Sequence, residues 1–414
     1  MESFNFLLFL AIILVSTKVL GIFSKKVKMP QVVGALVAGV ILGPSVLNLV
    51  QMESDGNFLA YMAEIGVILL MFCAGLETDL SELKANGVAS FIVAMCGVIV
   101  PLAGGFIAFA LYFHVDVSSF HECMKAVFVG TVLTATSVSI TVETLRELGH
   151  LKGKVGSTIL GAAIIDDILG IIVLTIVTSL EDTSVNPATV FGKIALYFVA
   201  IAVIWFVLAK LKPFLESQDQ LRRTAILALA FCFLMAYVSE EFFGIADITG
   251  AYIAGLIISN VQRSTYLESK FDTLSYLLLS PVFFASIGLK VNLPQMSVSI
   301  IMFAVALTVV AVLTKIVGCG LGAKICGYKN YQAKRIGVGM ISRGEVALIV
   351  ASKGSALGLM SSSILGPVIV VVVITTVITP ILLKVVFAPG TGPSTQVEDA
   401  KKVTSYYENR EDNR

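Results

Sequence analysis

Apolar runs of membrane-spanning length recur along almost the whole chain of 414 residues. Thirteen runs are bounded by charges or by clusters of Pro, Gly and Asn, at about 5–23, 30–50, 58–76, 87–113, 124–145, 155–179, 189–210, 223–240, 246–262, 274–289, 298–322, 335–358 and 363–387. A membrane-spanning helix needs about 20 apolar residues. The runs therefore predict an all-α polytopic membrane protein with thirteen transmembrane helices, forming one transmembrane domain over 1–387.

The charge balance and the cysteines exclude several other classes. The chain has 29 Lys and Arg against 28 Asp and Glu, so it lacks the basic excess of a nucleic-acid-binding protein. Its six cysteines are scattered without paired or metal-ligand spacing, and we interpret them as small buried apolar residues. The run GCGLG at 318–322 lies inside a span, where it predicts close helix packing rather than a nucleotide-binding loop. We expect no cofactor.

The distribution of lysine and arginine predicts the orientation in the membrane. One set of alternate loops carries 17 of these residues, whereas the opposite set carries three, namely Lys125, Lys290 and Lys353. Because basic loops stay in the cytoplasm, we expect the N-terminus outside and the C-terminus in the cytoplasm of a multi-pass cell-membrane protein. Residues 388–414 are polar and of mixed charge, which predicts a disordered cytoplasmic tail.

Five charged residues lie near the middle of predicted spans. They are Asp166 and Asp167 in the sixth span, Lys315 in the eleventh, and Arg343 and Glu345 in the twelfth. Each buried charge in a membrane is costly and marks a candidate functional site. If all five are ionised, the centre carries one net negative charge, which a monovalent cation or a proton would neutralise. The pattern favours a site at which an ion and a proton compete.

The two aspartates cannot have the same role, because neighbouring residues lie about 100° apart around a helix. One of them can serve as the counter-ion of Lys315, which leaves the other to face a water-filled path and bind a cation. A purely architectural ion network is the weaker interpretation, since buried ion pairs add little stability relative to apolar packing.

Backbone oxygens would help to bind a small cation, so interrupted helices are of interest. Gly337, Gly339 and Gly344 predict an interruption in the twelfth span. The fifth span carries hydroxyl groups at the same depth, from Thr131, Thr134, Thr136, Ser137 and Ser139. Because that run lacks Gly and Pro, its residues leave open whether the helix breaks there or the hydroxyls bond back to the helix.

Charges near the ends of the spans call for simpler interpretations. Glu77 and Asp79 close the third span, where we expect solvation at a helix end and in a loop rather than ligand binding. His150 lies in a predicted cytoplasmic loop, and we expect it to be solvated as well.

Several motifs together resemble a known family. They are MPQVVGALVAGVILGPS at 29–45, AEIGVILLMFCAGLETDL at 63–80, the Asp166–Asp167 pair, GAYIAGLIISN at 250–260, SPVFFASIGLKVNL at 280–293 and SRGEVALI at 342–349. The chain resembles the bacterial sodium/proton antiporters of the second cation:proton antiporter family (monovalent cation:proton antiporter-2). The likeness covers essentially the whole membrane region, and the motifs are specific as a set.

The resemblance implies a fold of two inverted six-helix repeats joined by a linker helix, with two broken crossing helices. Spans 1–6 and 8–13 would form the repeats, and span 7 the linker. Spans 4–6 and 11–13 would form a core in which spans 5 and 12 are broken. Spans 1–3 and 8–10 would form the scaffold and the interface of a homodimer in the lipid bilayer.

The resemblance also implies roles for single residues. Asp167 would carry the ion and the proton, so that Asp167 and Asp166 bind Na⁺, and Asp166 would pair with Lys315. Thr136 and Ser137 would lie at the first crossover. Arg343 and Glu345 would lie in the second broken helix. The core would move as a rigid body against the scaffold and expose the aspartates to each side in turn.

The predicted activity is exchange of Na⁺, with Li⁺ a second candidate ion, for H⁺ in the service of pH homeostasis, with two protons per sodium ion. Exchange of K⁺ for H⁺ on the same fold is the alternative, because carboxylate and hydroxyl oxygens alone do not select among these cations. An intramembrane aspartyl protease is disfavoured. Its two acids should come from separate facing helices, whereas Asp166 and Asp167 are adjacent on one helix. A passive channel is disfavoured by Lys315 in the path.

Overall fold

The computed structural model describes residues 5–27, 29–50, 57–116, 118–181, 187–216, 221–259, 264–290, 297–356, 358–360 and 362–388. Of the predicted tail at 388–414, all but Ala388 lie outside the described residues. The described backbone forms helices and no strand, which confirms the all-α prediction.

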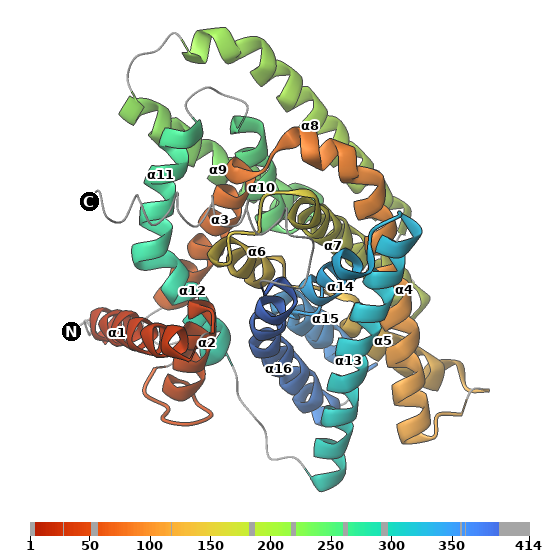
Figure 1. The fold of residues 1–414 in the computed structure, drawn as a ribbon. Helices are drawn as coiled ribbons and strands as arrows, with labels where there is room; N and C mark the ends of the chain where they lie inside the picture. The colour runs from red at the N-terminus through yellow and green to blue at the C-terminus, as the bar shows by residue number, and fades with distance from the viewer. Residues whose placement is uncertain are drawn as a thin grey trace.

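The helices follow one another in the order shown by colour in Figure 1. They are α1 (Asn5–Lys26), α2 (Gln31–Leu42), α3 (Phe58–Glu77), α4 (Leu80–Phe113), α5 (Phe120–Thr134), α6 (Val138–Glu147), α7 (Lys154–Glu181), α8 (Pro187–Glu216), α9 (Leu221–Phe243), α10 (Asp247–Ile258), α11 (Ser264–Leu274), the π-helix η1 (Ser275–Leu279), α12 (Ser280–Leu289), α13 (Val298–Ile325), α14 (Asn330–Gly339), α15 (Glu345–Ala356) and α16 (Ser362–Phe387).

Ten stretches of the described residues are long and apolar enough to cross a membrane. They are Asn5–Lys26, Phe58–Glu77, Leu80–Phe113, Phe120–Glu147, Lys154–Leu180, Pro187–Val207, Thr224–Phe243, Tyr266–Leu289, Val298–Ile325 and Ile364–Phe387. Three shorter apolar helices are Gln31–Leu42, Asp247–Ile258 and Val346–Ser355. Each of the thirteen predicted spans overlaps one of these stretches.

Some predicted boundaries differ from the observed ones. The second predicted span, 30–50, is helical only to Leu42, because Gly43 precedes Pro44 and adopts an extended backbone with φ −77° and ψ −178°. The fourth span begins at Leu80 rather than near 87. There the Asp79 carboxylate accepts a hydrogen bond from the backbone N–H of Ser81 at 2.7 Å and caps the helix.

The helices pack into two groups. The first group contains α1–α3 and α9–α12, in which α2 packs on α12 and α3 on α10. The second group contains α4–α7 and α13–α16, in which α4 packs on α7 and α13. α8 contacts α7 and α9, and α6 meets α2 and α3 of the first group. In Figure 1, α1, α2, α11 and α12 of the first group lie at the left and α4, α5 and α13 of the second group at the right, with α6 and α16 of the second group between them.

Close packing of α13 on α4 depends on the glycines of the GCGLG run. A Cβ atom on Gly318 would come within 2.6 Å of the Cys96 carbonyl oxygen, and one on Gly322 within 2.9 Å of Val93 Cα. Any larger residue would separate the two backbones. The structure therefore confirms the packing role predicted for this run.

Candidate ion-binding site

Two interrupted helices meet in the middle of the second group. The first is interrupted between Thr134 and Val138, and the second between Gly339 and Glu345. Ser137 N–H donates to the Ser342 carbonyl at 2.8 Å, and the Ser342 hydroxyl donates to the Ser137 carbonyl, also at 2.8 Å. These reciprocal bonds satisfy backbone groups that the interruptions release from the helices.

The interruptions bring four helix ends together. The half-helices α6 and α15 begin at the crossing, whereas α5 and α14 end there. Helix N-termini carry a partial positive charge and C-termini a partial negative charge, so the crossing presents both signs within the apolar interior. Such half-helix ends are the features that bind ions in many secondary transporters.

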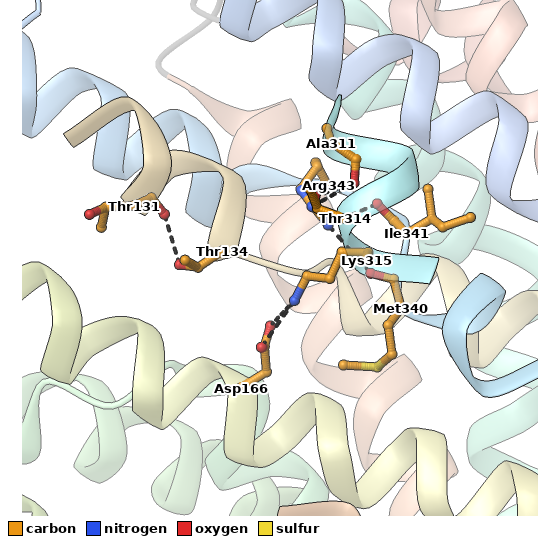
Figure 2. A network of polar contacts seen from close by, with 9 residues as sticks. All are labelled: Thr131, Thr134, Asp166, Ala311, Thr314, Lys315, Met340, Ile341 and Arg343. Carbon is orange, nitrogen blue, oxygen red and sulfur yellow. Dashed lines mark hydrogen bonds and ion pairs between the residues drawn. The ribbon is translucent and has the colours of Figure 1, made fainter. Parts of the chain in front are cut away.

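Lys315 and Asp166 form a buried ion pair beside the crossing. The Lys315 ammonium of α13 donates to both carboxylate oxygens of Asp166 on α7, at 3.1 and 3.2 Å. The side chains are 0% and 1% exposed. Figure 2 shows Lys315 reaching across to Asp166 from the opposite helix. Two residues 149 positions apart thus compensate each other's charge.

Asp167 is buried next to this pair but is not paired in the same way. Its residue exposure is 6%, and in the described part of the chain neither of its carboxylate oxygens has a hydrogen-bond partner. The hydroxyl of Thr136, in the first interruption, is likewise buried, and it lies beside the Asp166 carboxylate without a hydrogen bond of good geometry to the described residues. These oxygens are free acceptors, which is the chemistry that a small cation or a proton requires.

Arg343 is buried in the second interruption, where backbone carbonyls hold its guanidinium group. Its Nη1 donates to the carbonyls of Met340 and Ile341 at 3.3 and 2.9 Å, and its Nη2 to that of Ala311 at 3.3 Å (Figure 2). A cation at the C-terminal end of α14 is stabilised by the partial negative charge of that end. Arg343 therefore braces the interruption.

The other predicted site residues have simpler surroundings. Ser137 Oγ lies 3.4 Å from Ser139 Oγ. The hydroxyls of Thr131 and Thr134 bond back to carbonyls of their own helix, which is the simpler interpretation of such residues. The backbone of Glu345 begins α15, and its side chain lies outside the described residues.

Two features of the site are not evident from the sequence. Gly97 of α4 faces the ion pair, since a Cβ atom there would lie 2.6 Å from Cys319 Sγ and 3.5 Å from Lys315 Nζ. Hydroxyl groups of α16 hold the Arg343 backbone, because Arg343 N–H donates to Thr375 at 3.2 Å and Thr376 donates to the Arg343 carbonyl at 2.7 Å. The pair of threonines inside an apolar span was the available signal for the second feature.

The expectation for Glu77 is wrong. Its side chain is 4% exposed and forms an ion pair with Arg146 of α6, so it is a buried partner rather than a solvated helix end. Asp79 does lie at a helix end, where hydrogen bonds from backbone N–H groups lower the pKa of its carboxyl. His150 is half-buried rather than solvated, and its ring stacks on that of Phe387.

The sequence pattern described as "Sodium/hydrogen exchanger, transmembrane" matches residues 10–388. The chain belongs to this family. It is 41% identical over 387 residues to the Na⁺/H⁺-K⁺ antiporter GerN of Bacillus cereus, covering 93% of this chain and 97% of that one. It is 36% identical over 391 residues to a Na⁺/H⁺ antiporter of Enterococcus hirae, covering 92% and 97%.

The fold of this sodium/hydrogen exchanger is also found in a solved structure. The sodium proton antiporter MjNhaP1 of Methanocaldococcus jannaschii superposes with a TM-score of 0.71 at 18% identity, covering 95% of this chain and 100% of that one. Membership of the family makes the chain a multi-pass membrane transporter and not an enzyme, which excludes the intramembrane protease.

Proposed function

We propose that the protein is a secondary antiporter that exchanges Na⁺ for H⁺, with Asp167 as the residue that binds each of them in turn. The observation that carries the proposal is the buried Asp167 carboxylate, without a hydrogen-bond partner in the described part of the chain, next to the Asp166–Lys315 pair. The Na⁺/H⁺ antiporters among its relatives support the choice of ions.

Competition between the two ions follows from electrostatics. A carboxylate in a poorly screened interior binds a cation strongly, and it takes up a proton when no cation is present. Thr136 and Ser137 at the first interruption would supply further oxygen ligands, with Asp166 as the second carboxylate. Because Na⁺ and H⁺ neutralise the same charge, only one of them binds Asp167 at a time, and this exclusion couples the two fluxes.

We further propose that two protons are exchanged for each sodium ion. Na⁺ would bind when both aspartates are ionised and Lys315 is released from Asp166. When Na⁺ leaves, one proton would return to Asp167 and the second to the Asp166–Lys315 pair, which titrates as a coupled unit. Two positive charges, the protons, would then cross the membrane in one direction for each sodium ion that crosses in the other, so exchange would generate a current.

The order of the helices supports two repeats of six spans. In each half a short helix of 12 residues comes second, α2 in one and α10 in the other. In each half the interrupted helix comes fifth, between two long helices. We therefore propose that the chain crosses the membrane thirteen times in two inverted repeats, with α8 as the linker between them. The second group would be the moving core, and the first group would be the scaffold.

The proposed subfamily, orientation in the membrane and oligomeric state are inferred from the sequence. The adjacent Asp166–Asp167 pair supports placement in the second cation:proton antiporter family. The loop charges support an outside N-terminus and a cytoplasmic C-terminus. The resemblance supports a homodimer formed through the scaffold. Potassium is the second cation to test, since one relative is named a Na⁺/H⁺-K⁺ antiporter.

The decisive experiment compares Asp167→Asn with the intact protein in proteoliposomes that report an internal pH change by fluorescence dequenching. The substitution keeps the shape and removes the exchangeable charge. We expect the wild type to respond to Na⁺, and the variant to insert normally and lose coupled exchange. The control, Asp79→Asn, removes a carboxylate outside the membrane while asparagine still caps α4, and it should retain exchange. Robust Na⁺-driven proton movement by Asp167→Asn would reject the assignment.

The stoichiometry is tested by clamping the membrane potential while a sodium gradient is imposed. Exchange of two protons for one sodium ion predicts a current, and a potential that accelerates or slows exchange according to its sign. Electroneutral exchange predicts neither. In that case Lys315 would only brace the core, and Asp167 alone would set a ratio of one to one.

A further inference from the structure

Charged side chains at the end of α6 join the two helix groups. Nη2 of Arg146 in the second group donates to Asp272 of α11 at 2.7 Å and to Glu77 of α3 at 2.6 Å, and both acceptors belong to the first group. The Arg146 and Glu77 side chains are 20% and 4% exposed. Water therefore screens the Glu77 contact weakly.

The next residue makes a second contact between the groups. Both carboxylate oxygens of Glu147 accept from the backbone N–H of Gln31, at 2.8 Å each. Gln31 is the first residue of α2, so this carboxylate interacts with the positive end of a helix that belongs to the first group. The last turn of α6 thus contacts α2, α3 and α11 through charge.

The same boundary continues toward the far end of α12. A cavity of about 30 Å³ lies there, lined by Ser286 and Lys290 at the end of α12 and by Gly344 at the crossing. Asp272 lies 17 residues before Leu289, the last residue of the helical stretch Tyr266–Leu289, or about 26 Å at 1.5 Å per residue. Charged side chains bridge the boundary near Asp272, and the small cavity lies in it near Lys290, where it reaches Gly344.

We infer that Arg146 is a positioning residue that holds the ion site closed toward the end of the molecule at which α6 terminates. Its bridge to Glu77 and Asp272 stabilises the conformation in which the two groups are joined at that end. Each transport cycle breaks and re-forms this bridge. The inference rests on the proposed movement of the second group against the first, and by the loop charges the closed end is the cytoplasmic one.

A contact that only holds the fold together would join helices that move as one body. The structure contains such a contact nearby, in which Glu82 of α4 accepts hydrogen bonds from Gly153 N–H and Ser157 Oγ at 2.9 Å each. All three residues belong to the second group. The Arg146 bridge differs because its partners lie on the other side of the moving boundary.

This difference provides a cross-linking test. In a background with the six native cysteines replaced by alanine, Arg146→Cys is combined with Asp272→Cys, and a short bismaleimide joins the two thiols. The matched control joins Glu82→Cys to Ser157→Cys within the second group. We expect cross-linking of the first pair to abolish Na⁺/H⁺ exchange and cross-linking of the control pair to leave it unchanged. Exchange at the uncross-linked rate by the first pair would overturn the inference.

A kinetic test asks whether the bridge sets the population of the two states. Arg146→Gln should increase the fraction of protein open to the cytoplasm, so the KM for Na⁺ at that face, measured in everted membrane vesicles, should fall about threefold to tenfold. Arg146→Lys keeps the charge and should restore much of the wild-type KM. The exposed Asp272→Asn should show a smaller fall, and it provides the measurement if Arg146→Gln does not fold.

The outcomes separate this inference from the proposed function. If the wild type shows no Na⁺/H⁺ exchange, the proposed function fails. If the wild type exchanges ions but KM at the cytoplasmic face is unchanged or raised in both Arg146→Gln and Asp272→Asn, the bridge is not a gate and the antiporter assignment stands.

Discussion

The two interrupted helices meet at one crossing, yet they are built differently. The first interruption, at 135–137, contains hydroxyl side chains and no glycine or proline. The second, at 340–344, is preceded by Gly337 and Gly339 and ends with Gly344. None of these three glycines adopts the left-handed backbone region that favours glycine. Their role is close approach, since a Cβ atom on Gly337 would lie 2.6 Å from the Ile316 carbonyl.

This difference assigns separate tasks to the two interruptions. The second lets other backbones approach closely and is held by Arg343, Thr375 and Thr376. The first is held in an extended conformation by Ser342 of the second, and it presents the Thr136 hydroxyl without a hydrogen-bond partner among the described residues. We therefore expect changes in the second interruption to act through geometry, and changes in the first to act through ion binding.

Of the changes at the two interruptions, the largest effect is expected from Gly344→Ala. The new Cβ would lie 2.8 Å from both Cβ and Oγ of Ser137, so the two interruptions would have to separate. Overpacking of this kind costs about 1–3 kcal/mol. Because the crossing forms the proposed site, we expect Na⁺/H⁺ exchange in proteoliposomes to fall at least about tenfold.

Gly87→Ala on α4 is the matched control. A Cβ atom at Gly87 would meet nothing within 4 Å, and alanine favours a helix by about 0.5–1 kcal/mol. This control should exchange ions at the wild-type rate. Wild-type exchange by Gly344→Ala as well would show that the crossing tolerates separation, and close approach would no longer explain the glycines.

A smaller and more specific effect is expected from Thr136→Val. The substitution keeps the shape and removes a hydroxyl that makes no hydrogen bond to the described residues, so the free energy of unfolding should not fall. If that hydroxyl is a ligand of Na⁺, its loss should raise the KM for Na⁺ about tenfold, which corresponds to about 1.4 kcal/mol. Exchange measured over a range of Na⁺ concentrations checks this.

Ser342→Ala should behave in the opposite way. It removes a hydroxyl that donates to the Ser137 carbonyl and lies 3.0 Å from Thr141 Oγ1, so stability should fall by about 1 kcal/mol for each lost hydrogen bond. The KM for Na⁺ should change little. If instead Thr136→Val lowers stability and Ser342→Ala raises the KM for Na⁺, then the first interruption is structural and the second one binds the ion.

The difference between the two interruptions also shows which features of the fold the sequence could predict. Hydropathy is a local property, so each predicted span corresponds to an apolar helix in the structure. The interruption near Gly344 was also predictable, because glycines inside a span are a local signal. The interruption at 135–137 was left open by its own residues, because it is held by contacts between Ser137 and Ser342, which lie 205 positions apart.

Ion pairs over long distances were harder to predict than the charges themselves. Asp166 and Lys315 stood out because a charge inside an apolar run is conspicuous. The residues predicted that one of the two aspartates pairs with Lys315, and only the resemblance implied that this one is Asp166. Glu77 was misinterpreted because it lies where a span ends, a position at which most carboxylates are solvated. The structure buries it because α6 of the other group brings Arg146 against it.

The far ends of the interrupted helices share one aromatic ring. Phe387, at the end of α16, contacts the His150 ring after α6, with centroids 4.6 Å apart, and the Arg335 guanidinium of α14, 4.6 Å from the Phe387 centroid. The two half-helices are thus joined at a second place, away from the crossing. Here a residue that follows the first interrupted helix carries a titratable group.

The smallest expected effect concerns pH. Burial and the nearby Arg335 lower the pKa of His150 below its ordinary value of 6.5. The unfolded chain therefore binds a proton at a higher pH than the folded one. The free energy of unfolding is therefore unaffected by protonation of His150 above about pH 6.5, and it decreases as the pH falls toward the lowered pKa.

His150→Phe keeps a ring against Phe387 and cannot be protonated, so its thermal midpoint should fall less between about pH 7 and pH 5 than that of the wild type. Circular dichroism in detergent measures both midpoints. Equal declines would show that His150 protonation does not affect the fold, and would limit the contact between the two half-helices to apolar packing.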